Sequence, residues 1–77
     1  MSIDPTVNHV LNRKELEQSI NCGCIYCLKI FPIGEIKEWV DGGMTAICPH
    51  CLVDSLVGDT QMELNTENLQ PLHNYWF

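Results

Sequence analysis

The chain contains two copies of the pattern Cys-x-x-Cys, at Cys24-Ile25-Tyr26-Cys27 and Cys48-Pro49-His50-Cys51. Two thiolates separated by two residues can point at one metal ion, and two such pairs complete the tetrahedral shell that Zn(II) prefers. The segment between the pairs has a length typical of zinc sites. We therefore predict one structural zinc ion. Its predicted ligands are Cys24, Cys27, Cys48 and Cys51.

The remaining cysteine and the histidines are weaker metal-ligand candidates. Cys22 lies two residues before the first pair, and we expect a small, partly buried side chain there rather than a ligand or reactive thiol. His50 lies inside the second pair, where coordination would strain the geometry, so we expect it to be exposed. His9 and His73 have no partner identifiable from sequence, and surface or packing roles are expected for both.

The size of the chain favours one domain that needs a metal. With 77 residues, residues 1–77 form a single domain whose core alone is marginal. The first residues lack the features of a secretory signal, and no apolar run approaches the ~20 residues that cross a bilayer. We therefore expect a cytoplasmic protein with no membrane segment. In that reducing compartment, paired cysteines more often bind metal than form structural disulfides.

The charge of the chain is a second constraint on partners. The chain has ten Asp and Glu residues and four Lys and Arg residues, which gives a formal net charge of −6. Nucleic-acid binding depends on basic side chains that neutralise phosphates, so nucleic acid is a poor first candidate. An acidic surface instead suits a protein partner with a basic surface.

Local patterns predict the elements before the second cysteine pair. Asn12 and Glu15 form a capping-box pattern for a short helix over 12–20, whereas 1–11 give only weak support for order. A strand and turn are expected over 28–34. Strands over 36–40 and 45–48 flank Asp41-Gly42-Gly43, which is a good hairpin signal.

The pattern after the second pair predicts helices. Pro49 suits a first helical position, and apolar residues then recur at helical spacing as far as Gly58. A last short helix is expected after Asn65, which can act as its N-cap, with Pro71 weakening or delaying it. The apolar residues that define the first of these helices are Leu52, Val53, Leu56 and Val57.

The order of a cysteine knuckle, a hairpin and a helix opened by the second pair resembles the treble-clef zinc finger. The predicted fold class is therefore a small α+β zinc-bound domain with flanking short helices. A zinc ribbon is the alternative, in which 48–51 form a second knuckle within a sheet. Zinc knuckles often carry Gly after their second cysteine, where this chain has Leu28 and Leu52.

The chain also resembles a family of short bacterial cytoplasmic proteins without an assigned function. The likeness spans about residues 24–77, although the family has Gly where Leu52 stands. It implies a bacterial, cytosolic, zinc-binding protein carried on mobile or defence-related genetic elements. The matching segments are Ile36-Lys37-Glu38-Trp39, Asp41-Gly42-Gly43, Thr45-Ala46-Ile47-Cys48-Pro49-His50-Cys51, Asp54-Ser55 and Trp76-Phe77.

No acid, base or nucleophile for catalysis is identifiable, so we predict a non-enzyme. Glu35, Glu38 and Asp41 are expected to belong to a solvated acidic face, and Trp39 to the core. The leading hypothesis is a protein-interaction module, such as an adaptor, inhibitor or immunity-type partner. Large rings are enriched at interface hot spots, so the candidate interaction surface is the aromatic end, Tyr75, Trp76 and Phe77.

Three alternatives stay open at this point. The aromatic end can dock within the chain or in a homo-oligomer. A nucleic-acid-associated zinc-finger regulator would use Lys29 and Lys37. A thiol redox switch would pair Cys22 with Cys24 or Cys27.

Overall fold

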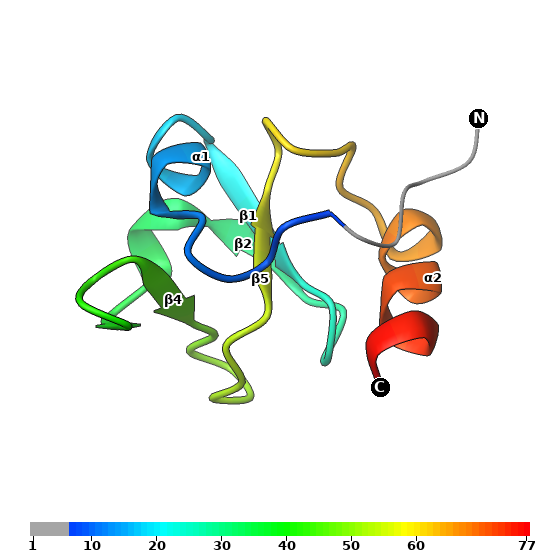
Figure 1. Ribbon diagram of the computed structural model, residues 1–77. Helices are drawn as coiled ribbons and strands as arrows, with labels where there is room; N and C mark the ends of the chain where they lie inside the picture. Colours follow the sequence, from blue (N-terminus) through cyan, green and yellow to red (C-terminus); the bar gives the residue numbers. More distant parts are fainter. Residues whose placement is uncertain (1–6) are drawn as a thin grey trace.

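A computed structural model describes residues 7–77 of the chain (Figure 1). We predicted little order over residues 1–11. Residues 1–6 lie outside the described residues, and residues 7–11 form no helix. The elements are α1 (Arg13–Glu17), β1 (Asn21–Cys24), β2 (Ile30–Pro32), the 3₁₀ helix η1 (Ile33–Glu35), β3 (Glu38–Val40), β4 (Thr45–Ile47), β5 (Leu56–Gly58) and α2 (Thr66–Trp76).

A three-stranded antiparallel sheet with the order β2-β1-β5 forms the centre of the molecule. Cys22 of β1 lies opposite Phe31 on one side and Gly58 on the other. No strand was predicted over residues 21–24, yet this segment is the central strand. Gly23 suits that place because a Cβ there would lie 3.0 Å from Leu69 Cδ1 of α2. The missing side chain therefore lets α2 approach the sheet.

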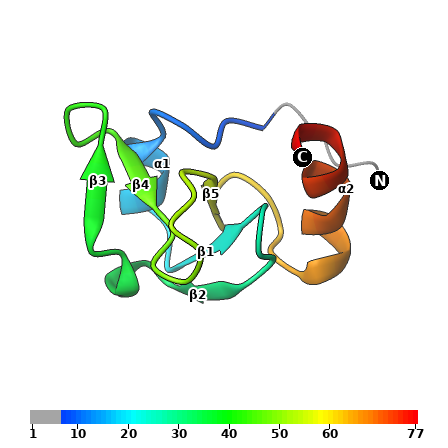
Figure 2. The same ribbon diagram turned by 90° about the horizontal axis from the view of Figure 1, so that it is seen from below.

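The predicted hairpin is confirmed as β3 and β4, which pair with Trp39 opposite Ala46. The turn places Asp41, Gly42 and Gly43 at φ of 55°, 69° and 87°. Such left-handed backbone is accessible to Gly and tolerated by Asp, so the sequence signal has a direct conformational cause. The hairpin and α2 lie at opposite ends of the molecule, with the sheet between them (Figure 2).

The prediction of a helix directly after the second cysteine pair is wrong. The chain makes a tight turn there and then enters β5. Leu56 and Val57 are both buried, but they belong to different core clusters, which is the alternation of a strand rather than of a helix face. Leu52, which helical spacing placed on the same face, is 73% exposed. The predicted small α+β class is confirmed, but the helix that a treble clef has after its second cysteine pair is not found in residues 7–77.

The two core clusters connect the sheet to its neighbours. The first joins Leu16 of α1 and Phe31 of β2 to the buried cysteines, with Trp39 packed against it. This position of Trp39 agrees with the core role expected from the sequence. The second joins Ile25 and Val57 to Leu69 and Leu72 of α2.

The predicted N-terminal cap is present on α2 but not on α1. The side chain of Asn65 accepts a hydrogen bond of 2.7 Å from the backbone N–H of Asn68, as its predicted N-cap role requires, and α2 continues past Pro71. Helix α1 is shorter than predicted, and Asn12 makes no side-chain cap. The Asn12 amide instead donates to the carbonyl of Leu56 at 2.8 Å, because it is buried beside β5.

Candidate metal centre

Each cysteine pair lies on a tight turn of the same form. The backbone N–H of Leu28 donates to the carbonyl of Cys24 at 2.9 Å, and that of Leu52 donates to the carbonyl of Cys48 at 2.8 Å. Both leucines have φ of 65°. The two turns are therefore equivalent knuckles, with leucine in the left-handed conformation that Gly often supplies.

The four predicted ligands come together at one point. Their sulfur atoms all lie within 4.8 Å of one another, with 3.5 Å between Cys24 and Cys51 and 3.8 Å between Cys27 and Cys48. Sulfurs at about 2.3 Å from a tetrahedral zinc ion lie about 3.8 Å apart. A disulfide would require about 2.05 Å. The donor set and its spacing thus fit one thiolate-bound metal ion.

Hydrogen bonds and burial make the four thiols unequal. Cys24 Sγ lies 3.4 Å from the Ser55 hydroxyl and accepts from the backbone N–H groups of Tyr26 and Cys27, each at 3.4 Å. Burial alone raises the pKa of Cys24, but these donors, Ser55 first, lower the pKa below its ordinary value. Burial raises the pKa of Cys27 and of Cys51. Cys24 is therefore the best-stabilised thiolate of these three.

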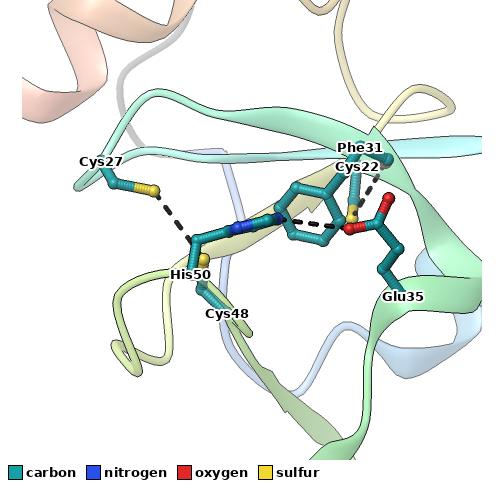
Figure 3. A network of polar contacts seen from close by, with 6 residues as sticks. All are labelled: Cys22, Cys27, Phe31, Glu35, Cys48 and His50. Carbon is teal, nitrogen blue, oxygen red and sulfur yellow. Dashed lines mark hydrogen bonds and ion pairs between the residues drawn. The ribbon is translucent and has the colours of Figure 1, made fainter.

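Cys22 lies outside this group of four. Its side chain is fully buried, and its sulfur lies 3.6 Å from the carbonyl oxygen of Phe31 (Figure 3). Burial, followed by the negative charge of Cys48 and Glu35, raises the pKa of Cys22 to about 12. The residue is a packing thiol, as expected, although more completely enclosed than the sequence indicated. Its burial gives no support to the redox-switch alternative.

His50 lies in the second knuckle, is exposed as predicted and is not among the clustered ligands. Its Nε2 lies 3.3 Å from a carboxylate oxygen of Glu35, and its ring makes an edge contact with Phe31 at 4.8 Å between centroids (Figure 3). Glu35 was expected on a solvated face, and its pairing with His50 was not predicted. Because only the fold brings η1 beside the second knuckle, no local sequence pattern indicates the pairing of Glu35 with His50.

The predicted aromatic surface is exposed and extends to the first knuckle. Tyr75 and Phe77 are exposed by 58% and 55%, and Trp76 contacts the ring of His9 at 4.8 Å. Tyr26, between two of the cysteines, contacts Phe77 at 5.0 Å. Tyr26 was itself a candidate for an exposed aromatic contact, but its contact with Phe77 could not be predicted, because it depends on the docking of α2.

Comparison with known proteins finds no matching family model, no matching curated protein and no matching solved structure. Within residues 7–77, no helix combines the length and apolar character that membrane crossing requires. The four-sulfur cluster is the feature on which a functional hypothesis must be built.

Proposed function

We propose that the chain is a non-catalytic, zinc-stabilised protein-interaction module of the bacterial cytoplasm, of the adaptor, inhibitor or immunity type. The observation that carries the proposal is the cluster of four cysteine sulfurs within 4.8 Å. A site closed by four protein thiolates is typical of structural zinc, whereas catalytic zinc keeps a position for water. When bound, zinc would supply a fixed cross-link between the two knuckles. Its proposed ligands are Cys24, Cys27, Cys48 and Cys51.

Within this proposal, the zinc ribbon is a better description than the treble clef. Both cysteine pairs lie on knuckles of equal geometry, and the second leads into strand β5 rather than a helix. These features correspond to the alternative fold weighed from the sequence. A ribbon supports many functions, so the assignment by itself says nothing of the partner.

Charge and exposed rings support a protein partner. The net charge of −6 disfavours phosphate backbones, and the four basic residues are divided among α1, the first knuckle and the segment before β3. Exposed aromatic residues supply large contact areas at protein interfaces. A partner with a basic surface would gain association rate and specificity from this acidity.

Two measurements test the proposal together. Elemental analysis of freshly purified protein should give one zinc per chain, and the absence of visible absorption would distinguish zinc from iron at the same ligands. Cross-linking in a lysate of the source organism should then enrich a protein partner with the zinc-loaded chain but not with Cys51→Ser. Metal-free protein that remains folded in chelator, or equal capture by both proteins, would contradict the proposal.

A further inference from the structure

One exposed surface is built jointly by the first knuckle and the end of α2. We call Tyr26, His73 and Phe77 the knuckle–helix surface. The Tyr26 ring lies 5.0 Å from that of Phe77 and 6.0 Å from that of His73, and His73 lies 5.7 Å from Phe77. Tyr26 is 46% exposed. These residues are distant in sequence, so the surface exists only in the folded chain.

Buried contacts fix this surface to the metal centre. His73 Nδ1 lies 3.1 Å from the carbonyl oxygen of Ile25, and the Ile25 side chain is fully buried with Leu69 and Leu72. Ile25 and Tyr26 are the two residues between the predicted ligands Cys24 and Cys27. The position of Tyr26 therefore depends on the knuckle that the metal would hold, and α2 is docked on the same turn.

The chain as a whole has a net charge of −6, and Lys29 adjoins the first knuckle. Residues 48–77 contain four carboxylates, Asp54, Asp59, Glu63 and Glu67, and no lysine or arginine. At the other end of the molecule, the chain uses its own cation on an aromatic ring, since the Arg13 guanidinium lies 4.4 Å from the centroid of Trp39. In the described part of the chain, no lysine or arginine is stacked on Tyr26 or Phe77.

We propose that the knuckle–helix surface binds an arginine- or lysine-bearing segment of a partner protein, and that zinc is needed to assemble it. This inference rests on the proposed function. Exposed aromatic rings attract cations through their π faces, and the net charge of −6 on the whole chain adds a long-range attraction for a basic partner. A second copy of the chain would bring the same net charge, and a nucleic acid would bring more negative charge. A basic segment is the occupant that electrostatics favours.

The test uses two synthetic peptides and the zinc-loaded full chain. One peptide alternates glycine with arginine, and the other replaces each arginine with citrulline, which has the same shape without the charge. We expect the arginine peptide to shift the NMR signals of Tyr26, His73 and Phe77, and the citrulline peptide to leave them in place. Tyr26→Ala should weaken the binding by about 2- to 30-fold, the range of a cation–π contact, whereas Tyr26→Phe should retain it.

Controls separate the surface from general charge attraction and from misfolding. Leu52→Ala changes an exposed residue of the other knuckle and should leave peptide affinity unchanged. Zinc content and circular dichroism should be the same for Tyr26→Ala and the parent chain. Signal shifts spread over the acidic residues of the whole chain, or equal affinity of Tyr26→Ala, would overturn this surface. Shifts with the citrulline peptide alone, self-association, or binding of an oligonucleotide here would also overturn it.

The proposed function can fail or stand separately. A lysate partner that binds Tyr26→Ala and the parent chain equally would leave the interaction module intact and remove only the knuckle–helix surface. A folded protein without metal would remove the proposed function and the zinc dependence together, whatever the peptide result.

Discussion

The Nδ1 atom of His73 lies 3.1 Å from the carbonyl oxygen of Ile25, and this contact joins α2 to the first knuckle. A carbonyl oxygen can only accept a hydrogen bond, so Nδ1 must carry the hydrogen. The ring tautomer is thereby assigned by the backbone that it contacts. The same contact connects the C-terminal part of the chain to the turn that carries two of the four clustered cysteines.

Replacing this histidine should loosen α2. His73→Ala removes the hydrogen bond and should lower the free energy of unfolding by about 1 kcal/mol. His73→Asn keeps an N–H donor on a side chain of similar reach, and should recover part of the loss. Urea denaturation of the zinc-loaded proteins measures both. Nitrogen-15 NMR of the parent should show hydrogen on Nδ1, and a neutral ring protonated only on Nε2 would contradict the contact.

Removing the metal or one ligand should unfold the domain. Cys51→Ser leaves three thiolates, and we expect loss of zinc and loss of cooperative thermal unfolding, because binding and folding are coupled in small structural zinc sites. Cys22→Ala is the matched control. It removes a buried thiol outside the cluster, so it should keep one zinc per chain and cost about 1 kcal/mol. Zinc loss from Cys22→Ala would show that the ligand set is wrong.

Ser55 should slow the release of the metal. Its hydroxyl lies 3.4 Å from Cys24 Sγ and is almost fully buried. Groups that hydrogen-bond to metal ligands commonly contribute about 10- to 100-fold to metal affinity. Zinc should therefore pass from the Ser55→Ala variant to a coloured chelator about tenfold faster than from the parent chain. Ser19→Ala removes a hydroxyl bonded to Glu15 and Thr60 instead, and its transfer rate should match the parent.

The leucines of the two knuckles should respond differently to glycine. Left-handed backbone costs a residue with a side chain about 1–2 kcal/mol, while glycine loses about 0.5–1 kcal/mol more chain entropy on folding. Leu52 is mostly exposed, so Leu52→Gly should stabilise by about 0.5–1 kcal/mol. Leu28 packs against the second core cluster, so Leu28→Gly should be destabilising. Thermal unfolding of both variants with excess zinc checks the difference.

The buried amide of Asn12 should not tolerate a carboxylate. Its Nδ2 donates to the carbonyl of Leu56 at 2.8 Å and lies 3.1 Å from Gln61 Oε1. Asn12→Asp has nearly the same shape but places an acceptor against these oxygens, and should cost about 2–3 kcal/mol. Asn8→Asp, at an exposed position, should change stability by less than about 0.5 kcal/mol. Equal stability of the two variants in urea would contradict the assigned role of Asn12.

The features that were predictable from the sequence have local causes. The spacing of the cysteine pairs indicates their convergence, the Asp41-Gly42-Gly43 turn indicates the hairpin, and Asn65 indicates the start of α2. Each depends on residues within a few positions of one another. The structure bears out all three.

The features that were missed depend on contacts between distant segments. Leu52, Val53, Leu56 and Val57 match a helical repeat, but β1 is available to pair with residues 56–58, and this pairing buries Leu56 and Val57 on opposite faces. The roles of Ser55 and Glu35 likewise arise only when the knuckles come together. Periodicity in a single segment contains no information about an available neighbouring strand.

The first cysteine of each pair is fully enclosed, whereas the second, Cys27 or Cys51, is only half-buried. A metal at this point would have one open direction of approach. An incoming acceptor protein or small chelator would contact and displace Cys27 and Cys51 first. Cys24 and Cys48 would be the last ligands to dissociate. Exchange of an ion bound here would thus be directional, and it would begin while Cys24 and Cys48 still held the enclosed side of the centre.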